Sequence, residues 1–264
     1  LYNFTILFPG IIGALTTIII FALVRVVGGT TAGLIASLLF AISAPILVRG
    51  FMGWFKSEPL GLFYGLLGLY LFLSGIKSDN KKISISKLIG GGVFLAFGLA
   101  SWGGTQFFII PIGIFIFILP FLRKDFRFLI WGIPVFVTSL LLTTAVFERP
   151  GMEFVLGIGG FSLIIPTMFL VICSFIQKFN NSKNQTRNYL ILLVGIILIS
   201  SSILIINVEN HFLPSPSFRY LNAINPFLTT TNPLVDSVSE HATTTIHESF
   251  FMHSILMIFA GLGA

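Results

Sequence analysis

The side chains able to do chemistry in this sequence are few and lie in polar segments between long apolar runs. Glu58 closes the segment Arg-Gly-Phe-Met-Gly-Trp-Phe-Lys-Ser-Glu and precedes Pro59. Proline is favoured at the first position of a helix, so Glu58 is expected at or near a helix N-terminus. There the carboxylate either complements the helix dipole or binds a metal ion or substrate at a membrane surface.

A second carboxylate, Glu240, lies in the polar stretch Asp-Ser-Val-Ser-Glu-His, residues 236–241. Ser237 stands three residues before Glu240, which is the spacing of a capping box, so a capping role and a catalytic role both fit. His241 and His247 are candidate metal ligands. Their spacing matches no zinc motif, and solvated loop histidines explain them as well.

Two further residues bear on the chemistry. Arg219 lies between two aromatic residues and suits either an anchor at the membrane surface or a contact to a phosphate. Cys173 is the only cysteine and lies in an apolar run, so an internal disulfide and a cysteine-based zinc cluster are excluded.

The elements that position these residues are predicted to be membrane helices. The chain has 264 residues, of which 55% are hydrophobic and 9% charged, and its mean hydropathy is +1.01. A soluble domain carries about 25% charged residues, so the solvent of this chain must be largely lipid. The net charge of +6 does not indicate nucleic acid, because the basic residues are spread over short loops.

A membrane helix needs roughly 20 apolar residues. We expect one transmembrane domain over residues 1–264, an all-α polytopic bundle of eight full helices and a truncated ninth that begins near Ser249. The uncharged run 88–122 is too long for one crossing and is divided at Trp102, where two glycines permit a turn. The eight helices are expected at residues 6–27, 31–48, 59–76, 88–102, 107–122, 128–147, 154–176 and 189–208.

The loop charges predict the orientation of this bundle. If alternate loops share a side, 11 of the 15 basic residues fall on one side and 4 on the other. The richer side is then cytoplasmic, and the protein is expected to be a multi-pass protein of the cell membrane. Two segments are then external: the loop 49–59 and a longer loop at 209–248, whose length is typical of a functional loop.

Three motifs together resemble the catalytic subunit of oligosaccharyltransferase along essentially the whole chain, and the sequence Asn-Pro-Leu-Val-Asp at 232–236 looks like the archaeal form of that family. Ser237, Val238, Ser239, Glu240 and His241 are similar to the Ser-Val-Ser-Glu-His motif of that family's fifth external loop. Ser101–Gly104 resembles its Trp-Gly-Gly turn, and Arg49–Glu58 resembles the motif of its second external loop.

The resemblance implies a membrane glycosyltransferase of the GT-C type. Such an enzyme moves an oligosaccharide from a lipid pyrophosphate carrier such as dolichol to the Asn of Asn-X-Ser/Thr acceptors, with Mg²⁺ or Mn²⁺ as cofactor, at the extracytoplasmic face. It further implies that Glu58 is a metal ligand and that Glu240 contacts the acceptor amide. Lys56 and Arg219 are weaker candidates for the lipid phosphate.

One departure from the family pattern concerns the metal. The family usually has an acid two residues before the position of Glu58, where this chain has Lys56. An ammonium group cannot bind a metal ion, although it can neutralise a phosphate. The family's acidic first-loop motif and its soluble domain are expected before Leu1 and after Ala264, so the fragment alone is predicted to be inactive.

Two alternatives to an enzyme remain at this point. A transporter would show repeated halves and ionisable residues deep within its helices, whereas the polar residues here gather outside the apolar runs. A non-catalytic paralogue or scaffold is the other alternative, and Lys56 is the residue that favours it.

Overall fold

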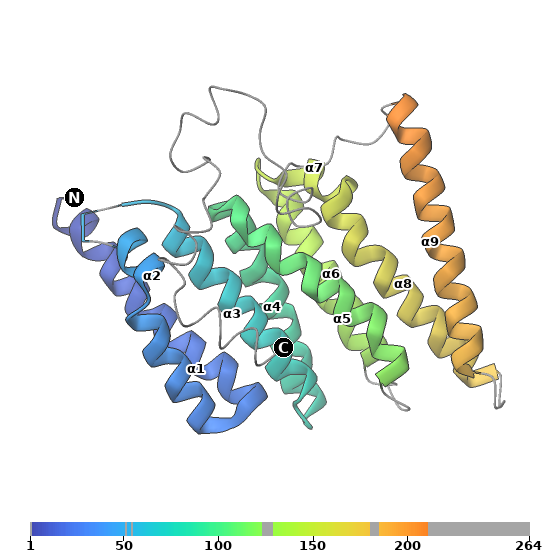
Figure 1. Cartoon of the computed structure of the whole chain (residues 1–264), viewed down its shortest axis with the longest axis horizontal. Helices are drawn as coiled ribbons and strands as arrows, with labels where there is room; N and C mark the ends of the chain where they lie inside the picture. The colour runs from blue at the N-terminus through green and yellow to red at the C-terminus, as the bar shows by residue number, and fades with distance from the viewer. Residues whose placement is uncertain (1, 51, 54, 123–128, 180–184, 211–264) are drawn as a thin grey trace. The chain divides into compact units, whose positions relative to one another are not determined.

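The structure is a computed structural model that describes residues 2–50, 52–53, 55–122, 129–179 and 185–210. Within these residues every regular element is a helix (Figure 1). The predicted all-α helical bundle is therefore confirmed. Residues 2–59 belong to one compact unit and residues 60–210 to a second.

The first unit contains a long kinked helix and a short one. α1 spans Tyr2–Ala41 and consists of two helical segments that meet at Gly29, whose φ of 86° lies in the region that favours glycine. α2 spans Ala44–Arg49 and has a proline in its first turn. The predicted helix at 31–48 is thus wrong as one piece, because that proline starts a new helix better than it continues an old one.

The segment after α2 folds back onto the start of α1. The backbone amide of Gly53 donates to the carbonyl oxygen of Ile6 at 3.3 Å. The ring of Phe55 lies 5.1 Å from that of Phe8 and 6.0 Å from that of Phe4, measured between centroids. These contacts anchor the chain just before the polar residues that precede α3.

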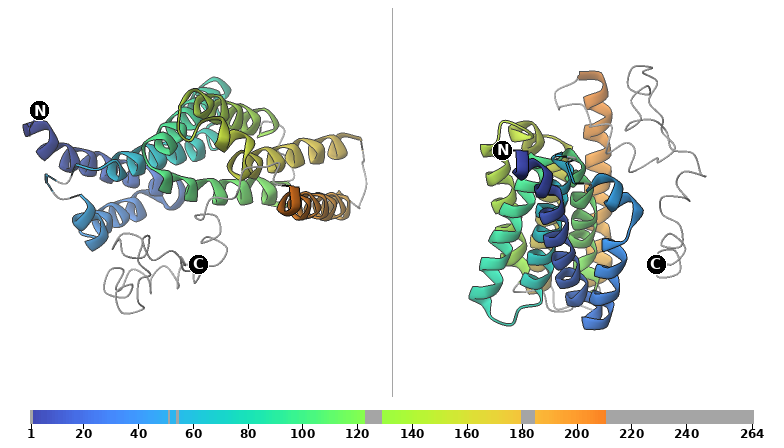
Figure 2. Two further views of the ribbon diagram at one scale, coloured as in Figure 1. Left: turned by 90° about the horizontal axis from the view of Figure 1, so that it is seen from above. Right: turned by 90° about the vertical axis from the view of Figure 1, so that its left-hand side faces the viewer.

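The remaining helices follow in an up-and-down order. α9 packs against α8 and contacts α5 (Figure 2). Their bounds are α3 Glu58–Ile76, α4 Lys81–Ser101, the 3-10 helix η1 Gly103–Phe108, α5 Ile109–Leu122, α6 Leu129–Val146, α7 Gly151–Leu156, α8 Ile158–Phe179 and α9 Gln185–Asn210.

Two predicted boundaries are wrong for local reasons. The helix expected from Leu88 begins at Lys81, because the side chain of Asn80 accepts hydrogen bonds from the amides of Lys82 and Ile83 and so caps the helix. The helix expected at 154–176 is divided at Gly157 into α7 and α8. The predicted break at Trp102 is confirmed, since α4 ends at Ser101 and η1 begins at Gly103.

Glycines let α3 and α4 pack backbone to backbone in antiparallel directions. A Cβ on Gly68 would lie 2.9 Å from the carbonyl oxygen of Gly91, and a Cβ on Gly75 would lie 3.3 Å from that of Ser84. On the other face of α4, a Cβ on Gly92 would lie 2.7 Å from the carbonyl oxygen of Phe136 in α6. Small residues allow this close approach in membrane bundles, where dispersion contacts rather than water drive packing.

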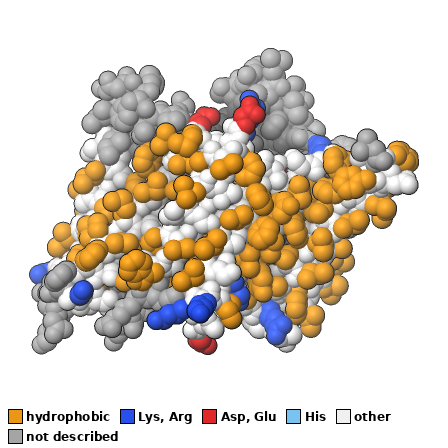
Figure 3. Space-filling model, turned by 180° about the vertical axis from the view of Figure 1, so that it is seen from behind, with side chains coloured by type: hydrophobic (Ala, Val, Ile, Leu, Met, Phe, Trp, Pro, Cys, Tyr) orange, Lys and Arg blue, Asp and Glu red, His pale blue; other side chains and the backbone are white. Residues whose placement is uncertain are grey.

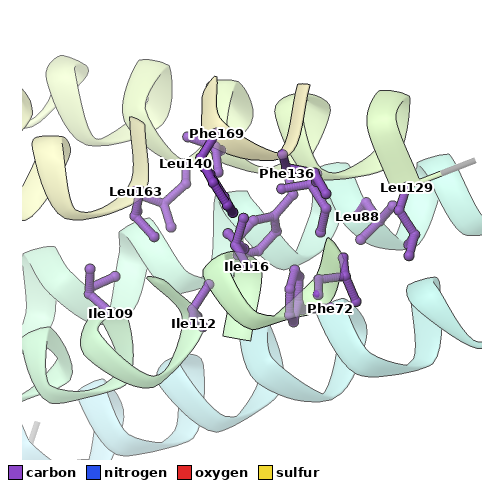
Figure 4. Close-up of a cluster of buried hydrophobic side chains, with 14 of the residues drawn as sticks. Phe72, Leu88, Ile109, Ile112, Ile116, Leu129, Phe136, Leu140, Leu163 and Phe169 are labelled. Atoms are coloured by element: carbon purple, nitrogen blue, oxygen red, sulfur yellow. The ribbon is translucent and has the colours of Figure 1, made fainter. Parts of the chain in front are cut away.

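Among the described residues, seven helices, α3 to α9, contribute buried side chains to the core of the second unit, part of which is shown in Figure 4. Phe72 of α3 and Phe136 of α6 lie at its centre, with ring centroids 4.5 Å apart. Their fully buried neighbours come from α4, α5, α6 and α8, and include Leu88, Ile109, Ile116, Leu140, Leu163 and Phe169. This core holds the ends of α3, α4 and α6 in fixed relative positions.

The outer surface suits a lipid solvent. Six helices in the described part of the chain are long and apolar enough to cross a membrane. Hydrophobic side chains cover the middle of the face shown in Figure 3, and Lys and Arg gather along one edge. In the second unit that edge is where α3 ends and α4 begins, and Lys87 of α4 donates there to the hydroxyl of Ser74 at 2.7 Å.

Candidate functional site

Glu58 is the first residue of α3, as the following proline predicts. Its side chain is half-buried, and so is that of Lys56, which lies in the non-helical segment before it. Both residues interact with a neighbouring group. The N-terminal end of a helix favours an acid over a cation, so an acidic residue suits this position of α3.

Trp102 forms the turn between α4 and η1. Its amide donates to the carbonyl oxygen of Gly98 at 2.9 Å, and its own carbonyl oxygen accepts from the amide of Thr105 at 3.0 Å. The indole ring covers Gly104 so closely that a Cβ there would collide with three of its carbons. The Trp-Gly-Gly sequence is therefore one packing unit, in which the second glycine makes room for the tryptophan ring.

The Trp102 turn rests on the first turns of α3. A Cβ on Gly61 would collide with the Cβ of Trp102, and a Cβ on Gly98 would lie 3.0 Å from the backbone nitrogen of Gly65. The buried hydroxyl of Thr105 donates to the carbonyl oxygen of Gly98 at 3.0 Å and lies 3.4 Å from that of Gly61. Residues 61–65 of α3 are thereby held against the end of α4.

The described residues provide only part of the donor set that a divalent metal ion requires. Hard cations such as Mg²⁺ prefer several oxygen ligands, and Glu58 supplies one carboxylate. Among the described residues no three His, Cys, Asp or Glu side chains lie close enough together to hold a metal. Lys56 adds an ammonium group, which cannot be a ligand. A carboxylate oxygen is a suitable donor for such a cation, and the role of Glu58 as a metal ligand stays a prediction.

Several predicted site residues lie outside the described part of the chain. These are Arg219 and the loop motif with Glu240, namely Ser237, Val238, Ser239, Glu240 and His241. The roles that the resemblance implies for Glu240 and Arg219 therefore stay predictions. The structure places Glu58 at the start of α3 and packs the Trp102 turn against the turn of α3 that follows.

Two features near this end of the second unit escaped the sequence-based prediction. The side-chain oxygen of Gln106 in η1 is buried and has no hydrogen-bond partner among the described residues. A groove of about 760 Å³ is lined by Tyr64, Phe97, Ala100, Ser101, Phe147, Glu148 and Arg149. The sequence signal for the groove was the charged pair Glu148-Arg149 directly after an apolar helix.

Comparison with known proteins gives consistent matches along the chain. The curated relatives carry the name dolichyl-diphosphooligosaccharide--protein glycosyltransferase, subunit STT3B in rice and Arabidopsis thaliana and subunit STT3 in Dictyostelium discoideum. The rice protein is 24% identical over 257 residues, and the match covers 94% of this chain and 35% of that protein. The Arabidopsis protein is 21% identical over 249 residues, and the match covers 92% of this chain and 33% of that protein. The Dictyostelium protein is 24% identical over 260 residues, and the match covers 94% of this chain and 35% of that protein.

A solved structure shows the same fold. The oligosaccharyltransferase of Archaeoglobus fulgidus, crystallised in the apo form, superposes with a TM-score of 0.68 at 17% identity. The superposition covers 98% of this chain and 33% of that one. The chain thus spans about a third of the length of the relatives that it matches.

The family described as "Oligosaccharyl transferase STT3, N-terminal" matches residues 1–261. The match includes the segment with Glu58, the Trp102 turn and the segment with Glu240. The chain belongs to this family.

Proposed function

We propose that the protein carrying this chain is an oligosaccharyltransferase that attaches a lipid-linked oligosaccharide to the Asn of Asn-X-Ser/Thr sequences in polypeptides. The family match over residues 1–261 is the observation that carries this proposal. The names of the curated relatives support it, since they describe transfer from a dolichyl diphosphate carrier to protein.

The proposed reaction is a substitution at a sugar carbon. The side-chain nitrogen of the acceptor Asn forms a bond to the anomeric carbon, and the bond from that carbon to the phosphate oxygen breaks. The carrier pyrophosphate leaves with the electron pair, and the amide proton passes to solvent. An amide nitrogen is a weak nucleophile, so the protein has to hold and activate it while charge develops on the pyrophosphate.

We assign different roles to the two carboxylates. Glu58, at the N-terminus of α3, is proposed as a ligand of Mg²⁺ or Mn²⁺, which would supply Lewis-acid stabilisation of the leaving pyrophosphate. Glu240 is proposed to contact the acceptor amide, with its loop over the bound peptide. Arg219 is a weaker candidate for the carrier phosphate.

The site is proposed to face the extracytoplasmic side of the cell membrane. Lys77, Lys81, Lys82 and Lys87 lie where α3 ends and α4 begins, whereas Glu58 and Trp102 lie at the opposite ends of these two helices. Basic residues concentrate on the cytoplasmic side of membrane proteins. The Asn-Pro-Leu-Val-Asp sequence at 232–236 leads us to propose an enzyme of the archaeal type.

Lys56 favours one alternative, a paralogue that keeps the fold without the activity. An ammonium group two residues before Glu58 would repel a bound cation, yet it could also neutralise a carrier phosphate. In an active enzyme, the neutralisation of the carrier phosphate by Lys56 must outweigh its repulsion of the cation. The transport alternative is not favoured by membership of a glycosyltransferase family.

The test is an assay of full-length protein with a lipid-linked oligosaccharide and an Asn-X-Thr peptide, with and without Mn²⁺. Glu58→Gln is expected to lower transfer by about a hundredfold or more, because it removes a charge that acts on the leaving group. Glu153→Gln is the matched control, since Glu153 is an exposed acid in the first turn of α7. Glu58→Gln and Glu153→Gln each remove a favourable interaction between a carboxylate and a helix dipole, which contributes about 1 kcal/mol or less.

The possible outcomes separate the proposals. Transfer lost in Glu58→Gln and in Glu240→Gln, but retained in Glu153→Gln, supports both assigned roles. Wild-type transfer in both of the first two variants would remove those roles while leaving the family's activity in place. Wild-type protein that transfers no glycan at any Mn²⁺ concentration would establish the inactive paralogue.

A further inference from the structure

The groove at the ends of α3, α4 and α6 has an aromatic wall. Tyr64 and Phe97 lie edge to face with ring centroids 5.7 Å apart, and Phe97 and Phe147 lie edge to face at the same distance. Phe94 stacks on Tyr64 at 6.0 Å. All of these rings are half-buried, so they present a continuous apolar surface to whatever enters the groove.

The open end of the groove carries two charges of opposite sign. Glu148 and Arg149 follow directly after α6, and both side chains are exposed. Neither forms an ion pair with another residue in the described ranges. They stand where an apolar helix ends, which is the level at which a membrane helix leaves the hydrocarbon and enters the headgroup region.

Together these features match the two ends of a phospholipid. An aromatic wall accepts a hydrocarbon chain, and a guanidinium group binds a phosphate through paired hydrogen bonds. A carboxylate beside it would repel a purely anionic headgroup but would bind an ammonium group. The volume of about 760 Å³ lies in the range of sites that hold small organic ligands.

We infer that this groove binds one zwitterionic aminophospholipid of the surrounding membrane, with its phosphate on Arg149, its ammonium on Glu148 and an acyl chain along Tyr64, Phe97 and Phe147. The site is separate from the proposed transfer reaction and does not depend on it. A bound lipid there would fill the space between the ends of α3, α4 and α6.

Lipid retention measures this directly. Full-length protein is reconstituted in nanodiscs of equal parts phosphatidylethanolamine, phosphatidylcholine and phosphatidylglycerol. It is then released into mild detergent, and native mass spectrometry identifies the lipids that remain bound. The wild-type protein is expected to keep one phosphatidylethanolamine in preference to the other two lipids. Arg149→Gln should lower its retention by about tenfold, the loss expected for a charge-assisted hydrogen bond. Glu148→Gln should let phosphatidylglycerol compete equally.

Two further variants make the test specific to the groove. Ala100→Phe fills the groove without changing a charge and should also displace the lipid. Lys82→Gln is the matched control, because Lys82 lines a smaller groove with Ile85, Ser86 and Ile89 at the other end of α4, and it should leave retention unchanged.

The opposite results would overturn the proposal. Unchanged phosphatidylethanolamine retention in both Arg149→Gln and Ala100→Phe would place the bound lipid elsewhere or show that none is selected. A lipid-linked oligosaccharide or a peptide displaced by the same two variants, with no effect on phospholipid, would assign the groove to a different ligand.

Discussion

Gly61 of α3 and Trp102 at the end of α4 lie in direct backbone contact. A Cβ on Gly61 would collide with the Cβ of Trp102 and would lie 3.2 Å from its backbone nitrogen and 3.3 Å from its Cα. Gly61 is three residues after Glu58, so the helix that begins with the candidate metal ligand is held from its first turns by the Trp-Gly-Gly turn.

Replacement of Gly61 by alanine is expected to destabilise the protein by about 1–3 kcal/mol, because the new methyl group meets backbone atoms that cannot move aside. Thermal unfolding in detergent measures the loss. Gly195→Ala is the matched control, since nothing lies within 4 Å of a Cβ there, and a helical alanine gains up to about 1 kcal/mol over glycine. Equal effects of the two changes would contradict the close packing of α3 against α4.

Replacement of Thr105 by valine is expected to cost about 1 kcal/mol, because it removes a buried hydroxyl that bonds the carbonyl oxygen of Gly98 and keeps the side-chain shape. Thr105→Ser should restore most of the stability. Thr144→Val provides a comparison, because the hydroxyl of Thr144 bonds only within its own helix, to Leu140. A larger cost at Thr144 than at Thr105 would argue against the hydroxyl as a link between helices.

A substitution at Tyr189 is expected to maintain or increase the stability of the protein, unlike the two above. Its side chain is 4% exposed, its hydroxyl has no hydrogen-bond partner among the described residues, and its ring packs edge to face on Phe121. Tyr189→Phe keeps the ring contact and removes the unpaired hydroxyl, so the melting temperature should stay equal or rise.

Ser139→Ala is the contrasting variant to Tyr189→Phe. The hydroxyl of Ser139 in α6 donates to the carbonyl oxygen of Ile89 in α4 at 2.9 Å, so this change should lower stability by about 1 kcal/mol. A clear loss of stability in Tyr189→Phe would show that its hydroxyl has a partner, such as a water molecule or a lipid.

Lys56→Asp tests how the departure from the family pattern affects the metal. The change removes a cation two residues before Glu58 and adds an oxygen ligand of the kind that Mn²⁺ prefers. The Mn²⁺ concentration for half-maximal glycan transfer by the full-length protein should fall by about tenfold or more. Lys56→Gln separates the two effects, since it removes the charge without adding a carboxylate. A higher Mn²⁺ requirement in Lys56→Asp would indicate that Lys56 serves the carrier phosphate instead.

Much of the helical pattern was predictable because it follows from local sequence. The start of α3 at Glu58 and the break at Trp102 rest on a proline and on paired glycines, which act within a few residues of themselves. The start of α4 was missed because Asn80 caps a turn rich in lysine, which hydropathy alone assigns to a loop. The division at Gly157 was missed because the residues on both sides are apolar.

The candidate site was predictable only in part. Glu58 could be singled out because a carboxylate before a proline at the edge of an apolar run is rare in this chain. Its packing environment could not be foreseen, because Gly61, Gly65 and Gly98 carry no side chain that would indicate which helix each one faces. The buried oxygen of Gln106 and the groove with Glu148 and Arg149 were missed because both depend on neighbours that are distant in the sequence.

The amino-acid sequence by itself determined that this chain lies in lipid. It also determined the approximate positions of most helix ends and which of those ends carry the basic residues. Those properties follow from hydropathy, capping and charge, which act over one or two helical turns. Only the tertiary structure decided that Trp102 packs on Gly61, that α4 lies between α3 and α6, and that three aromatic rings and two charges share one groove. Such contacts join residues that are distant in the sequence, as Thr105 and Gly61 show at a separation of 44 positions. They arise because apolar helices of similar composition are distinguished only by how closely their small residues let them approach.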